Sequence, residues 1–410
     1  MNFDDTPEEA AFRAEARDWL ARTAPKFVTP GPDEADDARE AAYIRRAKAW
    51  QAAKAEGGYA AITWPKEFGG RGGRPIEQVI YSQEERRYSV PSGPFQIGLG
   101  MCVPTVMTWG DDAARKRFVG PAVRGEEIWC QLFSEPAAGS DLAGIRTRSE
   151  KKGDEWIVNG QKVWTSGAHY SDWGILVTRS DPSQPKHKGL TFFYLDMKSP
   201  GVEVRPIQQI WGGANFNEVY FNDVRIPDSQ RFGAPGEGWK VALTMLMHER
   251  LAISAGQVTT DVKDFFELAG EIELETGPAL ENAAVREQIA DWYVRSEGLK
   301  FTTYRALTAL SRGETPGPEG SIGKVVSAPQ LQALGTLGMD LGDMAGGLTE
   351  EDVAPLKAAF QRAYLFAPGL RIAGGTDEIL RNIVAERVLG LPPDIRVDKS
   401  VAFNELPVGR

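Results

Sequence analysis

Cysteine, histidine and long apolar stretches are scarce in this sequence, and each scarcity excludes a class of protein. The two cysteines, Cys102 and Cys130, are too few for a disulfide framework. The sequence also has no Cys-x-x-Cys pair of the kind that binds zinc. Three histidines leave little for a histidine-rich site, so we expect no metal. No apolar run approaches the roughly 18 residues of a membrane helix, and the acidic N-terminus lacks the features of a secretion signal. We therefore expect a cytoplasmic protein with no membrane partner.

Positive charge is also in deficit. The chain has 47 basic and 57 acidic side chains, a net charge of −10. A nucleic-acid-binding protein needs a basic face, so we expect no nucleic-acid partner. With 410 residues, of which 42% are hydrophobic, the chain is long enough for substantial cores and for two or three domains. A soluble enzyme fits these numbers best.

The hydrophobic patterns change twice along the chain. Thr6-Pro7-Glu8-Glu9 is a capping box, and the apolar residues that follow it predict a helical N-terminal domain over 1–127. Short β-rich runs punctuated by Pro and Gly, with no helices between them, predict an antiparallel β-barrel or sandwich domain over 128–236. Helical patterning then returns and predicts a C-terminal helical bundle over 237–410. The fold class is therefore α+β.

Two local predictions follow from these patterns. The first is a hairpin with strands Glu155–Val158 and Gln161–Trp164, joined by a turn at Asn159-Gly160. The second is a set of C-terminal helices near residues 238–270, 282–311, 321–339, 350–366 and 376–389.

Glu249 is the strongest catalytic candidate by pattern alone. It falls on the apolar stripe of the helix that begins near Trp239, whose members are Ala242, Met245, Leu246, Ala252 and Ile253. A desolvated carboxylate has a raised pKa and can act as a general base near neutral pH. A buried pair with Arg250 is the alternative, and the pattern leaves both open. His248-Glu249-Arg250 lacks the second histidine of a zinc helix, and no Gly-x-Ser-x-Gly elbow supports a hydrolase.

Two other segments could bind a ligand. Small and capping residues in Leu132–Asp141 build a turn whose main-chain amides could hold a phosphate or the edge of a planar cofactor. An ordinary loop explains the same residues. Trp164 and Ser166 offer an aromatic face and a hydroxyl, with packing inside the barrel as the alternative.

Three motifs, in order, resemble those of the acyl-CoA dehydrogenases. They are Ser134–Asp141 (Ser-Glu-Pro-Ala-Ala-Gly-Ser-Asp), Asn159–Trp164 (Asn-Gly-Gln-Lys-Val-Trp) and Gly375–Arg381 (Gly-Thr-Asp-Glu-Ile-Leu-Arg). The resemblance implies a lipid-metabolism flavoprotein that binds FAD between its β-domain and its C-terminal helices. It also implies oxidation of an acyl-CoA to the trans-2,3-enoyl product, with electrons passed to an electron-transfer flavoprotein.

The resemblance also implies roles for single residues. The residues expected to bind FAD are Gln131, Phe133, Ser134, Ser140, Trp164, Ser166, Gln332, Gly335, Thr376 and Glu378. Of these, Gln332 and Gly335, with Gly338, match a motif that reaches FAD across a dimer interface. We therefore expect a homotetramer or a mixed tetramer. The residues expected to bind substrate are Ser140, Arg250 and Gly374.

The chain departs from the common family pattern at two places. Many members carry their catalytic glutamate where this chain has Gly374. Another branch, which includes the isovaleryl type, places the base in a Glu-Arg-Leu sequence on the first C-terminal helix, and Glu249-Arg250-Leu251 matches it. The second departure is that the Arg-x-x-Phe-Gly cofactor segment is not found between Glu271 and Arg295. The missing segment, the Met-His-Glu-Arg sequence at 247–250 and the terminal sequence 381–390 resemble those of a bacterial subgroup that acts on steroid side chains and forms mixed tetramers.

Several alternatives remain open at this stage. An oxidase or monooxygenase of the same fold, or a non-catalytic subunit of a mixed tetramer, would carry the same motifs. The acyl group could be fatty, branched, steroid-derived or aromatic. The residues Gly98, Gly100, Met101 and Cys102 could line its pocket or could pack helices.

Overall fold

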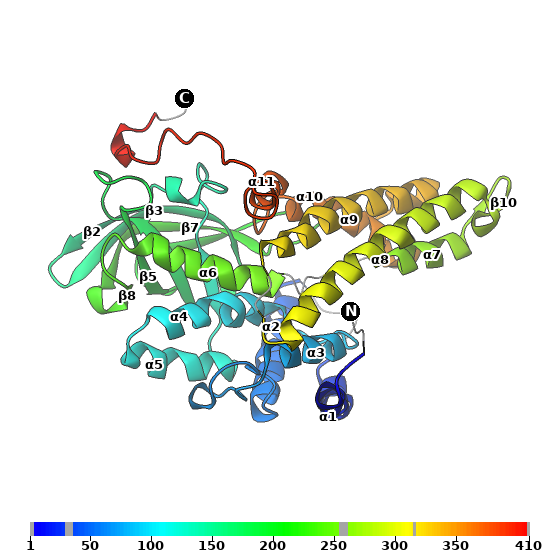
Figure 1. Cartoon of the computed structure of the whole chain (residues 1–410), viewed down its shortest axis with the longest axis horizontal. Helices are drawn as coiled ribbons and strands as arrows, with labels where there is room; N and C mark the ends of the chain where they lie inside the picture. The colour runs from blue at the N-terminus through cyan, green and yellow to red at the C-terminus, as the bar shows by residue number, and fades with distance from the viewer. Residues whose placement is uncertain (1–3, 29–35, 254–260, 315–316, 408–410) are drawn as a thin grey trace. The chain divides into compact units, whose positions relative to one another are not determined.

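The structure is a computed structural model that describes residues 4–28, 36–253, 261–314 and 317–407 (Figure 1). The structure describes only the main chain of residues 36–38, 249–253, 307, 310 and 319. The chain divides into two compact units. The sheet unit contains Asp4–Gln208, Ala214–Ala252 and Asp394–Arg410, and the helical unit contains Gln209–Gly213 and Ile253–Pro393.

The sheet unit begins with helices, as the N-terminal pattern predicts. They are α1 (Pro7–Thr23), α2 (Asp36–Glu56), α3 (Pro75–Glu85), α4 (Val103–Trp109) and α5 (Asp112–Val123). The predicted capping box at Thr6 is confirmed, since Thr6 Oγ1 accepts from Glu9 N at 3.3 Å and Glu9 Oε2 accepts from Thr6 N at 3.0 Å. Helices α1 and α3 are joined by a buried carboxylate, because Glu84 accepts hydrogen bonds from Arg13 and Arg17 at 3.1 Å.

An eight-stranded sheet forms the centre of this unit. Its strands are β1 (Trp129–Leu132), β2 (Arg148–Lys152), β3 (Glu155–Ser166), β4 (Trp173–Arg179), β5 (Leu190–Asp196), β6 (Val202–Ile207), β7 (Phe216–Pro227) and β8 (Arg231–Phe232). The order is β6-β7-β3-β2-β4-β5-β8, and β1 pairs with β4. Most pairs are antiparallel, as expected. The pairs β1–β4 and β2–β4 are parallel, because the chain returns to β4 only after the β2–β3 hairpin.

The predicted turn at Asn159-Gly160 is wrong. Residues 155–166 form one continuous strand, and the turn lies earlier, where Gly153 has a φ of +63°. Asn159-Gly160 is instead an irregularity in the pairing of β3 with β7, where the register shifts between Val158 and Gly160. Gly160 is required there because a Cβ atom would lie 2.6 Å from the Oγ1 atom of Thr147. Burial on both sides of the dipeptide thus outweighs its turn propensity.

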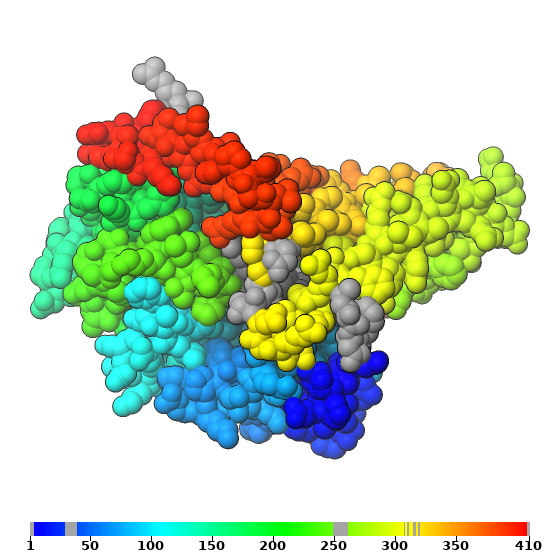
Figure 2. All heavy atoms as spheres, in the orientation of Figure 1, coloured from blue at the N-terminus to red at the C-terminus, as the bar shows by residue number. Residues whose placement is uncertain are grey.

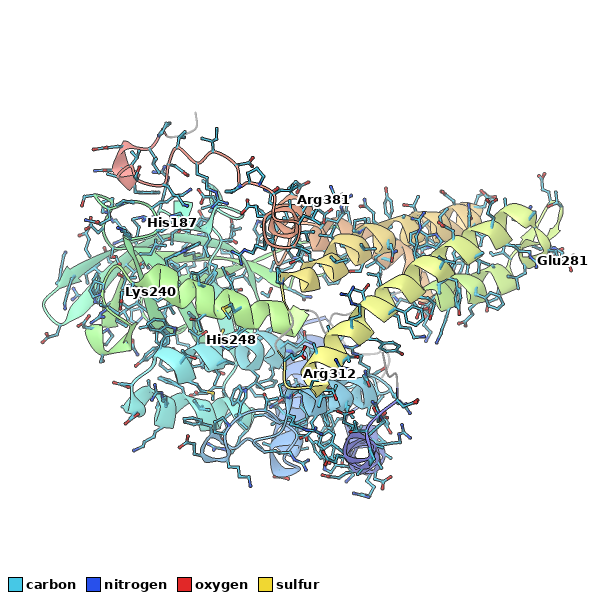
Figure 3. All side chains as sticks on the ribbon, in the orientation of Figure 1. His187, Lys240, His248, Glu281, Arg312 and Arg381 are labelled. Atoms are coloured by element: carbon cyan, nitrogen blue, oxygen red, sulfur yellow. The ribbon has the colours of Figure 1, made fainter. Side chains whose placement is uncertain are left out.

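Helix α6 (Gly238–Ile253) packs against the N-terminal helices and the sheet (Figure 3 labels Lys240 and His248 along it). Its first half confirms the predicted apolar stripe, since Ala242 and Met245 are fully buried in one core with Val106 of α4 and Phe232 of β8. A hydrogen bond of 3.1 Å from Trp109 Nε1 to Thr244 Oγ1 fixes the helix to α4.

The helical unit is a bundle of α7 (Val262–Glu271), α8 (Ala283–Ser311), α9 (Ser321–Leu341), α10 (Ala359–Leu370) and α11 (Asp377–Arg387). Its core joins Phe265, Trp292, Leu334 and Phe360 from four different helices. A short hairpin, β9 (Glu273–Leu274) and β10 (Gly277–Pro278), connects α7 to α8.

Two predicted C-terminal helices differ from those observed. The segment 238–270 contains two helices, because α6 ends at Ile253 and α7 begins only after its cap Asp261; residues 254–260 lie outside the description. The helix expected at 350–366 begins at Ala359, since Leu356, Lys357 and Ala358 have positive φ values. No helix in the described part of the chain is long and apolar enough to span a membrane.

Candidate active site

The motif Ser134–Asp141 forms the loop after β1, and a buried carboxylate fixes its first half. Glu135 is 8% exposed and accepts hydrogen bonds from Arg146 N (2.6 Å), Thr147 N (2.9 Å) and Lys162 Nζ (2.8 Å). Burial alone would raise the pKa of this carboxyl, but Lys162 and the two amides hold it below its usual value. Glu135 therefore stays ionised at neutral pH and ties the loop to the strand that follows it.

Lys162 is the matching cation and is fully buried. Its Nζ atom also donates to the carbonyl oxygen of Phe133 at 2.9 Å. Burial lowers the pKa of Lys162 to about 8, and Glu135 opposes that shift. Because Val163 N donates to Ser134 O at 2.9 Å, residues 133–135 are held by three neighbouring contacts from β3. The position of Ser134 is thus set by the sequence Lys162-Val163.

Trp164 lies next on β3 with its side chain turned out of the sheet core. Its φ is +60°, in the left-handed region that costs a bulky residue about 1–3 kcal/mol, and the β3–β7 register shifts around it. The side chain is 58% exposed and makes an edge contact with Phe216, with ring centroids 6.1 Å apart. Packing inside a barrel, one of the two interpretations of the sequence, does not describe this tryptophan.

The other predicted residues of this unit lie around the same strands. Ser166 is half-buried, and its hydroxyl makes no hydrogen bond to any residue that the structure describes. Gln131 is half-buried on β1, and Phe133 is buried with its ring edge-on to Phe192. Ser140 is exposed. This set offers an outward aromatic face and hydroxyl groups, which suit a planar, polar-edged ligand.

The amide nest expected in this loop is only partly available. Glu135 N donates to Ala138 O at 2.9 Å, and Ala138 N donates to Glu135 O at 3.0 Å. Those two amides are therefore used inside the turn, and the exposed second half of the loop, from Gly139, carries the remaining donors.

In the helical unit, the Gly-Gly-Thr turn precedes α11. Gly374 and Gly375 have φ values of +62° and +92°, which explains two successive glycines. Thr376 is the N-cap of α11, since its Oγ1 accepts from Ile379 N at 3.2 Å, and Glu378 is exposed in the first turn. Lys324 of α9 donates to the carbonyl oxygens of Ala373 and Gly375. The turn is thus fixed from two sides.

Gln332 is joined to the same turn through an arginine. Arg371 donates to Gln332 Oε1 at 3.1 Å and pairs with the buried Asp377 at 2.7 Å. The side-chain oxygen of Gln332 therefore has a partner within its own chain.

Gly335 and Gly338 lie where α9 crosses α10. A Cβ atom on Gly335 would lie 2.7 Å from the main-chain nitrogen of Tyr364, and one on Gly338 would lie 2.2 Å from the ring of Phe360. Close helix packing explains both glycines without a ligand, and the expected contact with FAD stays a prediction.

Replacing Gly335 by alanine should destabilise the protein by about 1–3 kcal/mol, the usual cost of overpacking. Gly323 on the same helix is the matched control, because a Cβ there meets no atom within 4 Å. Gly323→Ala should stabilise by about 0.5–1 kcal/mol, since alanine is the better helix former. Denaturant unfolding of both variants checks the difference. Equal stabilities would contradict the packing assignment.

The predicted base and its neighbour are placed only by their main chain. Glu249 and Arg250 belong to α6, and their side chains lie outside the described residues. The residues Gly98–Cys102 form a π-helical turn against Trp129, and Met101 and Cys102 are buried in the core of the sheet unit. Core packing accounts for these two side chains.

Sequence reasoning missed the charged residues that hold the site. These are Glu135, Lys162, Lys324 and Arg371. One signal was available, because Lys162 stands beside Val163 inside a β-rich run, and a lysine that is buried in a sheet needs a polar or charged partner. The partners of Lys324 and Arg371 depend on tertiary contacts that no local pattern carries.

Comparison with known families assigns almost the whole chain. The acyl-CoA dehydrogenase N-terminal, middle and C-terminal domain profiles match residues 6–126, 130–224 and 236–389. Acyl-CoA dehydrogenase IpdE1 of Mycolicibacterium smegmatis is 35% identical over 95% of this chain and 99% of its own length. IpdE1 of Mycobacterium tuberculosis is 36% identical over 94% of this chain and 98% of its own length. FadE34 of Mycobacterium tuberculosis is 37% identical over 83% of this chain. The matched region covers 46% of the length of FadE34.

Solved structures agree with this assignment. The Tcur3481-Tcur3483 steroid ACAD matches with a TM-score of 0.79 and 26% identity, covering 96% of this chain and 100% of that one. The ChsE4-ChsE5 complex of Mycobacterium tuberculosis matches with a TM-score of 0.78 and 26% identity, over 96% and 100%. The helical, β-sheet and helical order, the three motifs and these matches agree. The chain therefore belongs to the acyl-CoA dehydrogenase family, whose members are FAD-dependent oxidoreductases.

Proposed function

We propose that this acyl-CoA dehydrogenase binds FAD itself and oxidises an acyl-CoA to its trans-2,3-enoyl product. The observation that carries the proposal is Trp164, an exposed indole held in a left-handed bulge beside the fixed Ser134 loop. Strained backbone of this kind clusters at ligand-binding and active sites, so the left-handed Trp164 favours a ligand on its ring. An electron-transfer flavoprotein is the proposed electron acceptor.

The chemistry of the predicted FAD-binding residues fits the cofactor. Trp164 offers a ring face, Ser134 and Ser166 offer hydroxyls on the neighbouring loop and the same strand, and the N-terminus of α11 at Thr376 suits a phosphate. We assign these residues, with Gln131, Phe133, Ser140, Gln332, Gly335 and Glu378, to FAD binding. When bound, FAD supplies the acceptor for the hydride that leaves the β-carbon of the acyl chain.

Glu249 is the proposed base that removes the α-proton. In the sequence, it lies four residues after the fully buried Met245, on the apolar side of α6. A general base that works near neutral pH needs a carboxylate with an increased proton affinity, and a position on the apolar stripe of the sequence pattern favours one. We infer that Gly374 cannot replace it, because that position has no side chain, and that its main-chain amide is a donor for the thioester oxygen. Ser140 and Arg250 complete the proposed substrate contacts.

The proposed substrate class is a steroid-derived acyl-CoA. The support is the similarity to the steroid ACAD at 26% identity, together with the Met-His-Glu-Arg sequence at 247–250. The proposed assembly is a tetramer, built either from one kind of chain or from two unlike chains. The ChsE4-ChsE5 complex is a similar structure that contains two unlike chains. We also propose the three-part division 1–127, 128–236 and 237–410 for the domains.

Light scattering with in-line flavin absorbance tests the cofactor and the assembly together. We expect the purified chain, alone or with a partner subunit, to elute as an oligomer that carries flavin, and to release FAD on denaturation. An apoprotein that no added FAD reconstitutes would refute the cofactor assignment. A fully flavinated, active monomer would refute the assembly.

A further inference from the structure

The C-terminal segment 394–407 lies on the sheet unit, beside the loop that joins β4 to β5. Figure 2 shows this segment, in red, over the green atoms of the sheet unit. Phe403 N donates to Gln184 O at 2.9 Å, Asn404 N donates to Pro182 O at 3.0 Å, and Ala402 forms a β-bridge with Pro185. The segment is thus paired with the 182–186 loop along its main chain.

The first side-chain anchor is Phe403, which stacks on a buried arginine. The guanidinium carbon of Arg179 lies 3.8 Å from the centre of the Phe403 ring, and Arg179 is only 4% exposed. Arg179 donates to Lys186 O at 2.7 Å and to Ala143 O at 2.5 Å, while its buried Nε finds no acceptor among the described residues. The aromatic ring therefore covers a cation that is incompletely hydrogen-bonded.

The second anchor is Asp398, which pairs with Lys186. Lys186 is 7% exposed, and its Nζ atom also binds both carboxylate oxygens of Asp141, at 3.0 and 2.9 Å. One buried ammonium thus joins the C-terminal segment to the residue that follows Ser140. Figure 3 labels His187, the residue after Lys186.

Both anchors act on the same short stretch of chain. Phe403 acts through Arg179 on Ala143, and Asp398 acts through Lys186 on Asp141. Glu135 ties the two ends of the loop together, at residues 135 and 146–147, and Leu142 is buried in the core of the sheet unit. The exposed residues 139–141 lie between these fixed points and depend on the two relays.

We propose that the segment 394–407 is a strap that positions Ser140 and its neighbours for FAD and acyl-CoA. This inference rests on the proposed function, and Phe403 and Asp398 are positioning residues within it. Because the first half of the loop has its own anchor, loosening the strap leaves Ser134 and Trp164 in place. The consequence is weaker binding of acyl-CoA with little change at saturation.

Phe403→Ala tests the strap, with Phe403→Tyr as the conservative variant that keeps the ring. Asn404→Ala is the matched control, because Asn404 is the exposed neighbour on the same segment. We expect Phe403→Ala to raise KM for acyl-CoA about tenfold, the scale of a desolvated cation–π contact, with kcat nearly unchanged. Phe403→Tyr should restore most of the affinity, and Asn404→Ala should match the wild type.

Hydrogen exchange of the flavinated enzyme gives a readout independent of acyl-CoA turnover. Amides 139–144 should exchange faster in Phe403→Ala, while the Glu135-bound amides of Arg146 and Thr147 and those of β2 should not change. If Phe403→Ala does not fold, Asp398→Asn replaces it with the same two expectations. Unchanged exchange and unchanged KM would overturn the strap even if acyl-CoA oxidation is normal. If the wild type oxidises no acyl-CoA, the proposed function fails, and the exchange result still decides the strap.

Discussion

Glu249→Gln is expected to slow acyl-CoA-driven flavin reduction by about 10²–10⁴, the usual scale for losing a general base. Glutamine keeps the size and much of the hydrogen bonding of glutamate but cannot accept the proton. Folding and flavin content should survive, since helix α6 is held by its first half through Ala242, Met245 and Thr244. Anaerobic stopped-flow measurement of flavin bleaching checks the rate.

Gly374→Ala is the control for the alternative position of the base. It leaves Glu249 untouched and should retain much more activity, unless the added methyl blocks the thioester. Gly374 has a φ of +62°, so alanine there should cost about 1–2 kcal/mol of stability. A Glu249→Gln variant that reduces its flavin at the wild-type rate would place the base elsewhere.

Lys162→Met is expected to lower the free energy of unfolding by about 3–5 kcal/mol, the cost of leaving a buried charge without its partner. Glu135 keeps its two backbone donors but loses the only cation within ion-pair distance among the described residues. The Phe133 carbonyl loses its donor as well. Denaturant unfolding checks the loss, and FAD content should fall because Ser134 is no longer held.

The double variant Glu135→Gln/Lys162→Met is the control, since it removes the unpaired charge and should recover part of the loss. The pH dependence has a definite sign. In the wild type the pKa of Glu135 is lowered on folding, so its contribution to stability is present above pH 4.5 and is lost as the pH falls further. In Lys162→Met, Glu135 loses the cation that opposes the effect of burial and should take up a proton more readily, so the stability deficit relative to the wild type should shrink as the pH falls. A deficit that is small and independent of pH would contradict the assigned role.

Elements with a local chemical signal were predictable from the sequence. Thr6 and Glu9 cap α1 because the capping box is satisfied by neighbours in sequence, and the apolar stripe of α6 is formed by Ala242 and Met245 as expected. The order of helical and β-rich segments needs only hydrophobic periodicity. The three motifs then identify the family, because their order spans both units.

Features that depend on distant partners were not predictable in the same way. Asn159-Gly160 has strong turn propensity, yet Thr147 and β7 keep it extended within β3. The left-handed φ of Trp164 follows from a register shift that no local sequence specifies. Lys324 and Arg371 reach the 373–377 turn only once α9 lies beside it.

Anaerobic titration of the flavinated protein with a panel of acyl-CoA thioesters tests directly whether this chain oxidises an acyl-CoA with its own flavin. At least one thioester, with a steroid-derived acyl chain the first choice, should bleach the oxidised flavin stoichiometrically, and the bleaching should require Glu249. Slow reoxidation in air should follow, because the proposed acceptor is an electron-transfer flavoprotein. A protein with full FAD occupancy that no acyl-CoA bleaches, alone or with a partner subunit, would contradict the account.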